Sequence, residues 1–201
     1  SELLADLRSQ HPHWTQFVWD IWIRRVGPLW PLAGRIASLP FLPGGSSLET
    51  ARALLPQETA APWGRIKPAV QVGVGTPVAV FAGCTARNAR PGWIARAETL
   101  LRRWGYVVLD GGGFTCCGGT LHHAGLFAAQ AEVRRRNIER WRDMGRPVIA
   151  AFCASCKHGL DAYAEEGGME PEEAALWKRQ VRGLSALLAA PVCETVPDAP
   201  A

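Results

Sequence analysis

Five of the six cysteines in this 201-residue sequence lie in three short stretches. Cys84 is followed after 31 residues by the adjacent Cys116 and Cys117, and after 35 more residues by Cys153 and Cys156, which two residues separate. Thiolates that recur at such spacing in an otherwise ordinary globular sequence indicate a metal site or redox chemistry. A zinc ion bound by four of them would leave one spare. An iron–sulfur cluster accommodates all five, so the residues alone leave both kinds of centre open.

The residues around these cysteines predict alternating strands and helices. Short apolar runs predict buried strands, and longer stretches with apolar residues at helical spacing predict helices. The predicted strands are residues 78–82, 106–109 and 147–152, and the predicted helices are residues 93–104, 126–144, 157–165 and 171–190. This order predicts an α/β fold in which a short parallel sheet is flanked by helices, as in Rossmann-like folds.

The predicted fold brings the five cysteines together. Each of the three stretches follows the carboxyl end of a predicted strand, and open parallel sheets bind their ligands at that edge. Glycines at 111–113 and 118–119 flank the adjacent pair and let the backbone approach a bulky group closely. Cys153 and Cys156 precede a predicted helix, whose positive end favours thiolates. Cys193 lies outside the pattern in a proline-rich tail and is not expected to be a ligand.

The composition divides the chain into four segments. Residues 1–43 are rich in tryptophan and mostly helical, and residues 44–76 are rich in proline, glycine and alanine and are expected to be a linker. Residues 77–190 form the domain that carries the cysteines, and residues 191–201 form a tail. The net charge of +4 is modest. We expect no nucleic-acid binding, because the arginine run at 134–136 is typical of a solvated helix face.

Apolar residues recur at helical spacing near the N-terminus, among them Trp14, Val18, Ile21 and Trp22. This helix either packs against its own domain or a partner subunit, or lies in a membrane interface, where tryptophan is favoured. The start of the sequence has no basic region followed by an apolar core, and no apolar run is long enough to span a bilayer. We therefore expect a cytoplasmic protein, which the membrane interpretation would place peripherally at the inner membrane.

The cysteine stretches resemble those of a known family. Gly83–Cys84, Cys116–Gly118 and Cys153–Cys156 at these spacings are similar to the cysteine-rich CCG domain. That domain occurs in heterodisulfide reductase and in iron–sulfur subunits of glycolate oxidase, anaerobic glycerol-3-phosphate dehydrogenase and lactate-utilisation complexes. The resemblance covers residues 77–190. Family members commonly carry two such motifs, and this chain has one, so we expect a half-length protein or a fragment that holds the first motif.

The resemblance also implies a cofactor and partners. It implies that Cys84, Cys116, Cys117, Cys153 and Cys156 bind a [4Fe–4S] cluster, of the noncubane type in the heterodisulfide reductase branch. It implies an iron–sulfur subunit of an oxidoreductase, which passes electrons towards quinone from a flavoprotein dehydrogenase subunit acting on a 2-hydroxy acid or glycerol 3-phosphate. A second CCG domain is a further implied partner. The alternatives are disulfide reduction at the cluster, as in heterodisulfide reductase, and a zinc-stabilised module that assembles a partner, with Zn²⁺ replacing the cluster.

Two histidines follow the CCG motif, and this is similar to the glycolate-oxidase-like branch, where histidine often follows it. His122 and His123 are candidate acid–base groups beside the cluster or a substrate, because imidazole titrates near neutral pH. The other interpretation is that they stand at a helix start and contact only solvent or backbone.

Overall fold

A computed structural model describes residues 2–25, 27–39, 45, 49, 52, 64–151 and 153–195. Its centre is a four-stranded sheet with the strand order β3-β2-β4-β5, in which all three strand pairs are parallel. The strands are β2 (Pro77–Phe81), β3 (Val107–Leu109), β4 (Val148–Ala151) and β5 (Val181–Gly183). The predicted α/β fold with a short parallel sheet is confirmed, and its three predicted strands correspond to β2, β3 and β4.

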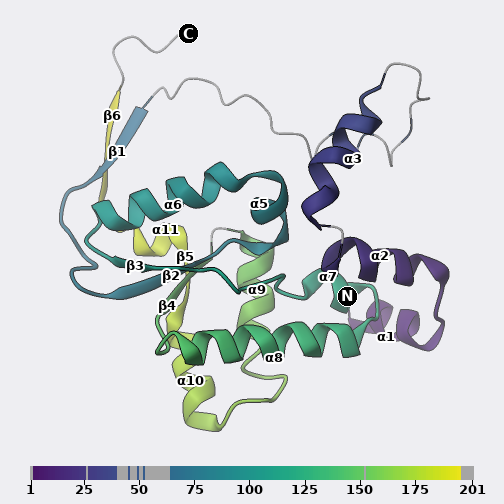
Figure 1. The fold of residues 1–201 in the computed structure, drawn as a ribbon. Helices are drawn as coiled ribbons and strands as arrows, with labels where there is room; N and C mark the ends of the chain where they lie inside the picture. Colours follow the sequence, from purple (N-terminus) through teal and green to yellow (C-terminus); the bar gives the residue numbers. More distant parts are fainter. Residues whose placement is uncertain are drawn as a thin grey trace.

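Helices cover both faces of this sheet (Figure 1). On one face lie α6 (Pro91–Arg103) and α11 (Leu184–Leu187), and on the other lie α8 (Phe127–Asp143), α9 (Ala154–Ala162) and α10 (Pro171–Gln180). Strand β2 separates two hydrophobic clusters, because its side chains alternate between the faces. Val78 and Val80 pack with Leu101 and Trp104, while Ala79 and Phe81 belong to the larger cluster on the other face.

The prediction of one helix over residues 171–190 is wrong. The chain leaves α10 after Gln180, forms the edge strand β5, and only then enters α11. Val181 is 2% exposed and pairs with Ile149 in β4. A β-branched side chain that fills the core next to the sheet is better accommodated in extended backbone than in a helix. Two short helices beside the cysteines were also not predicted, α5 (Gly83–Ala89) and α7 (Gly119–His123).

The N-terminal segment is helical, as predicted, and packs onto the domain. It contains α1 (Glu2–Gln10), α2 (Trp14–Arg24), a 3₁₀ turn η1 (Gly27–Leu29) and α3 (Trp30–Ala37). Ile23 on α2 is buried in the larger hydrophobic cluster of the domain. Arg24 donates a 2.6 Å hydrogen bond to Glu132 on α8. Trp22 and Trp30 stack with their ring centroids 5.6 Å apart, which joins α2 to α3.

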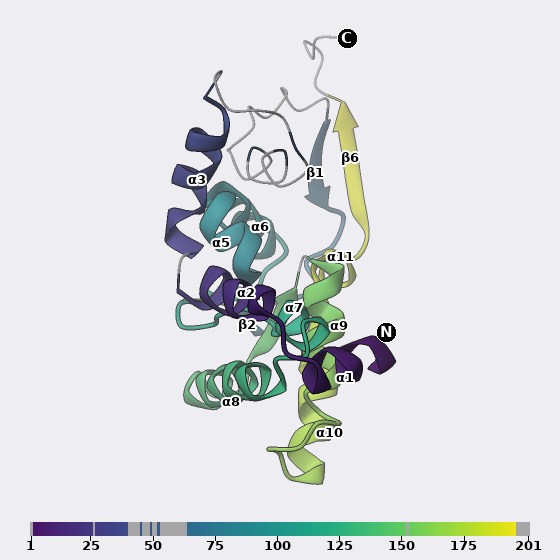
Figure 2. The same ribbon diagram turned by 90° about the vertical axis from the view of Figure 1, so that its right-hand side faces the viewer.

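A two-stranded antiparallel ribbon lies apart from the main sheet (Figure 2). It pairs β1 (Gly64–Pro68) with β6 (Pro191–Thr195), so parts of the expected linker and the expected tail form one element. The expected linker also includes residues 46–48 and 53–63, which lie outside the described residues, as does the end of the expected tail. Across the described ranges, no helix has both the length and the apolar character that crossing a bilayer requires.

Candidate functional site

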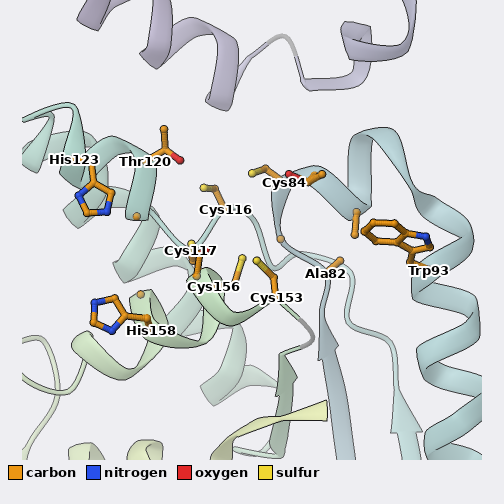
Figure 3. Close-up of a pocket in the computed structure, with 16 residues that line it drawn as sticks. Ala82, Cys84, Trp93, Cys116, Cys117, Thr120, His123, Cys153, Cys156 and His158 are labelled. Carbon is orange, nitrogen blue, oxygen red and sulfur yellow. The ribbon is translucent and has the colours of Figure 1, made fainter. Parts of the chain in front are cut away.

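The five cysteines of the pattern lie at the carboxyl ends of three neighbouring strands (Figure 3). Cys84 follows the central strand β2 and is the second residue of α5. The adjacent Cys116 and Cys117 lie in the loop that joins β3 to α7. Cys153 occupies the N-cap position of α9, two residues after the end of β4, and Cys156 lies in the first turn of that helix. The predicted convergence at this edge of the sheet is therefore what the structure contains.

Neighbouring thiols among these cysteines shift one another's pKa, so they form a chain of interacting pairs. The order of interaction is Cys84, Cys116, Cys117, Cys156 and Cys153. The three central members of this chain are buried, and the two end members are partly exposed. All five are free thiols. Cys193 is exposed on β6 and does not line the cavity that these five share.

Hydrogen bonding divides the thiols into proton donors and acceptors. Bonds from Cys116 and Cys156, together with the Gly119 amide, lower the pKa of Cys117 to about 3. The same bonds and burial raise the pKa of Cys116 and of Cys156 above the ordinary value for a thiol. Its hydrogen bond to Cys116 lowers the pKa of Cys84 to about 7. The site therefore favours negative charge at Cys117, and the thiolate is the form that binds metals and acts as a nucleophile.

The cysteines line a cavity of about 680 Å³, which is called the cysteine cavity below. Its walls differ in character. Thr120, His123 and His158 lie on one side of the sulfur atoms in Figure 3, and Trp93 lies on the other. A cavity of this volume extends beyond the cysteine sulfur atoms, so it has room for both a bound group and a small molecule beside it.

A buried polar network holds the loop that carries Cys116 and Cys117. The Asn137 amide on α8 donates 2.9 Å hydrogen bonds to the Cys116 carbonyl and to the Tyr163 hydroxyl. Its oxygen accepts a 3.0 Å bond from the Thr115 backbone amide. The Tyr163 hydroxyl in turn donates a 2.9 Å bond to the Cys117 carbonyl. Three consecutive residues of the loop are thus fixed by two side chains that are both 0% exposed.

Sequence reasoning did not identify Asn137 or Tyr163. A signal for Asn137 was present, because it stands four residues after Val133 and four before Trp141 on one helix face. Both of those neighbours are buried, and a polar residue within such an apolar stripe must find hydrogen-bond partners. Tyr163 has no comparable signal in the sequence.

Aromatic rings fix the position of Tyr163. Its ring stacks on Trp177 with the centroids 5.5 Å apart, and Trp177 meets Trp141 edge to face at 5.0 Å. The Trp177 indole donates a 2.7 Å bond to the Leu160 carbonyl on α9. Burial raises the pKa of Tyr163, so its hydroxyl keeps the proton that it donates to the loop.

Two glycines allow the sulfur atoms to pack closely against the backbone. Gly83 has a φ of 69°, and a Cβ placed on it would lie 2.8 Å from the Cys156 Sγ. A Cβ on Gly159 would lie 3.4 Å from the Cys117 Sγ. A larger residue at position 83 would need both a backbone conformation that is unfavourable for L-residues and space that a sulfur atom occupies.

The two candidate histidines differ in position. His123 lines the cysteine cavity, as does His158, which follows Cys156 on α9. His122 is absent from the described cavity lining, and its ring packs 5.3 Å from Phe127. The geometry therefore brings one of the two predicted histidines to the cysteines.

The donor set suits soft metals, because thiolates are ligands of zinc, copper(I) and iron–sulfur clusters. Within the ranges that the structure describes, no three His, Cys, Asp or Glu side chains converge in an arrangement that would hold a single metal ion. The five cysteines instead share the lining of one cavity. Five free cysteines in contact can bind a metal or a metal cluster, and the type of centre is a matter for proposal and experiment.

Comparison with known proteins identifies the region that holds these cysteines. Residues 78–161 match the family model described as the CCG cysteine-rich domain, and the match includes all five cysteines of the pattern. No curated protein and no solved structure matches the chain.

Proposed function

Because residues 78–161 are a CCG cysteine-rich domain, we propose that they bind a [4Fe–4S] cluster and form the electron-transfer part of an oxidoreductase. The ligands in this proposal are Cys84, Cys116, Cys117, Cys153 and Cys156. The observation that supports it is that all five cysteines line one cavity at the carboxyl ends of three neighbouring strands. A single tetrahedral ion would use four of them.

The protein's own groups would tune such a centre. When bound, the cluster would supply one-electron redox chemistry. Hydrogen bonds to the coordinating sulfur atoms and burial set the potential of a thiolate-bound centre. The Gly118 amide donates a 3.3 Å bond to the Cys116 Sγ. Asn137 and Tyr163 hold the loop carbonyls, so that the positions of the sulfur atoms change little when the charge of the site changes.

The proposed electron donor is a flavoprotein dehydrogenase subunit that oxidises a 2-hydroxy acid or glycerol 3-phosphate, and the proposed direction is towards quinone. Its support is the family resemblance of the cysteine motif. A second CCG domain, on this or another chain, belongs to the same proposal. We expect the second domain to contact this chain next to the cysteine cavity.

The N-terminal helices provide a surface for a partner. Exposed apolar side chains that are concentrated in one segment favour an interaction site there. The exposed apolar side chains on α1, α2 and α3 are Leu3, Leu4, Leu7, Trp14, Phe17, Val18, Trp19, Leu32 and Ile36, which are called the apolar N-terminal face below. We propose that the flavoprotein partner docks on this face, and a membrane surface is the alternative occupant.

Disulfide reduction at the cluster is a second candidate function. Two properties of the cysteine cavity favour this function. Its volume leaves space for a small disulfide beside the sulfur atoms, and hydroxyl and imidazole groups line that space. In this reaction a small disulfide would take up two electrons from the partner and two protons, and would leave as two thiols. An EPR signal of the oxidised cluster that stays unchanged when a small disulfide is added would exclude this function.

The deciding experiment is metal and acid-labile sulfide analysis, with EPR, on protein purified without oxygen. The proposal expects about four iron and four sulfide per chain and a paramagnetic state in one redox form. One zinc per chain, with neither sulfide nor colour, would contradict it and favour the zinc-stabilised assembly module.

Cysteine variants test the ligand assignment. Cys117→Ala and Cys153→Ala are expected to lose iron and electron transfer. The matched control is Cys193→Ala, because that cysteine is exposed on β6 and lies outside the cavity. Full iron content in both ligand variants would show the assignment to be wrong.

A further inference from the structure

A second hollow adjoins the cysteine cavity. It has a volume of about 430 Å³ and opens between the N-terminal helices and α7, and it is called the N-terminal hollow below. Thr120 and His123 line both spaces. The N-terminal hollow and the cysteine cavity therefore adjoin each other at these α7 residues. The function proposed above gives this second space no role.

Most residues in the described lining of the N-terminal hollow are polar. Arg8 contributes a guanidinium group, and His11, His13 and His123 contribute imidazoles. Thr120 adds a hydroxyl group. The described lining includes no aspartate or glutamate. A wall that carries a guanidinium group and no carboxylate attracts negative charge, and an arginine matches the geometry of a carboxylate or phosphate group.

We propose that the N-terminal hollow binds a small organic anion with a carboxylate or phosphate group. Its volume lies within the range of about 300–1,000 Å³ that is typical of small-molecule sites. Trp19 and Ala124 provide apolar surface for the hydrocarbon part of such a ligand. The three histidines stand too far apart to share one metal ion, since the described residues hold no group of that kind.

Hydrogen bonds already fix this wall in place. Arg8 donates a 2.5 Å bond to the His123 carbonyl, which joins α1 to α7. The Gln16 amide donates to the Arg8 carbonyl at 2.7 Å and to the Ala124 carbonyl at 2.8 Å. A Cβ on Gly125 would lie 2.8 Å from the Ala5 carbonyl oxygen, so α1 packs directly on the turn after α7. Groups held before the ligand arrives lose less conformational entropy on binding.

Calorimetric titration of the full chain tests the proposal. The probes are glycolate for a carboxylate and glycerol 3-phosphate for a phosphate, and glycerol is the neutral control. We expect at least one anion to bind and glycerol not to bind. Binding of glycolate alone assigns a carboxylate site, and binding of glycerol 3-phosphate alone assigns a phosphate site. Absence of binding by both anions overturns the proposal.

Variants locate the binding. Arg8→Gln is expected to weaken binding about tenfold or more, because it removes a charge-assisted hydrogen bond to the anion. Arg8 also supports the packing of α1, so a second variant is needed. This variant is His11→Gln, because His11 is exposed, lines the hollow and takes no part in the hydrogen bonds that join α1 to α7. Arg103→Gln, at an exposed position on α6, is the matched control. Equal weakening in Arg103→Gln, or unchanged binding in both hollow variants, overturns the proposal.

A second readout connects the N-terminal hollow to the redox centre and rests on the function proposed above. A bound anion beside the cluster disfavours the added negative charge of reduction, so it should lower the midpoint potential. By linkage, the anion then binds more tightly to the oxidised protein than to the reduced protein. If the anion binds in the calorimeter but does not change the midpoint potential, the anion site is supported and a cluster next to it is not.

Discussion

The Tyr163 hydroxyl donates a 2.9 Å hydrogen bond to the carbonyl oxygen of Cys117, a residue 46 positions earlier in the chain. This bond connects the end of α9 to the loop before α7 beneath the cysteine sulfur atoms. The same hydroxyl accepts a bond from Asn137 on α8. Two helices from one face of the sheet therefore meet at the backbone of the cysteine pair, and the conformation of the pair depends on both.

Tyr163→Phe should loosen the cysteine loop. The substitution leaves the buried Cys117 carbonyl and one Asn137 amide proton without a partner, which costs about 1–3 kcal/mol of unfolding free energy. We expect a chelator to remove the bound metal several times faster from this variant than from the wild type.

The control is Tyr106→Phe, at the other tyrosine of the chain. Its hydroxyl donates a hydrogen bond to the Leu187 carbonyl at 3.2 Å, beside the hydrophobic cluster on the face of the sheet opposite Tyr163. Metal release from this variant should match that of the wild type. Equal release rates in all three proteins would show that the Tyr163 bond does not hold the loop.

Gly83→Ala should disrupt the site. The new Cβ would lie 2.8 Å from the Cys156 Sγ, at a φ of 69° that L-residues rarely adopt. The expected cost is about 1–3 kcal/mol for the strained backbone alone, with a loss of metal content on purification. Gly92→Ala is the control, because no atom lies within 4 Å of the new Cβ and its φ is not positive. That variant should keep its full metal content.

The ion pairs of Glu173 should make stability depend on pH. The carboxylate accepts hydrogen bonds from Arg142 on α8 at 2.8 Å and from Arg146 at 3.2 Å, and these bonds, that of Arg142 first, lower the pKa of Glu173 below its ordinary 4.5. A lowered pKa stabilises the folded state above pH 4.5, and this stabilisation is lost as the pH falls through the folded-state value.

Glu173→Gln should therefore lower the unfolding free energy at pH 7 by about 1 kcal/mol or less, since both arginines are more than a third exposed. The difference in unfolding free energy between the variant and the wild type should become smaller below pH 4.5. Urea unfolding at several pH values measures this. Glu165→Gln is the control, because the Glu165 side chain is 73% exposed. A difference that is independent of pH would contradict the assignment.

Apolar side chains of the apolar N-terminal face should be replaceable by polar ones without loss of the fold. Trp14 and Phe17 are both 69% exposed, so Trp14→Ser with Phe17→Ser should change the unfolding free energy by no more than about 0.5 kcal/mol per site. We expect the double variant to bind less of an apolar fluorescent dye. The control is Val70→Ser with Val72→Ser, at exposed positions outside this face. Co-sedimentation of the wild type, and not of the double variant, with lipid vesicles would assign the face to a membrane rather than to a protein partner.

The sequence was sufficient for the parts of the fold that depend on regular patterns. Continuous apolar runs predicted β2 and β4, and the cysteine spacing predicted that three strand ends meet. The pattern failed at Val181, where an apolar residue within a helical stretch serves the sheet instead. Only the position of the neighbouring strand shows whether such an apolar residue belongs to a helix or to a sheet, and that position is a tertiary property.

The supporting network was beyond sequence reasoning for a related reason. Cys116 attracts attention by its chemistry, whereas Asn137 and Tyr163 act through backbone carbonyls that no motif marks. The N-terminal hollow is similar, because Arg8 and His123 belong to segments that were assigned to different units. Their meeting depends on how α1 packs against Gly125.

The parallel pairing of the central strands has a consequence for the order in which the chain folds. Val78 pairs with Val148, and Ile149 pairs with Val181, so each pairing closes a long loop and forms slowly. The thiols meet only when β2, β3 and β4 are in register. A metal group that binds all of them adds its free energy to the native state alone. In the function proposed above, loss of this group on oxidation would therefore lower the unfolding free energy as well as end redox activity.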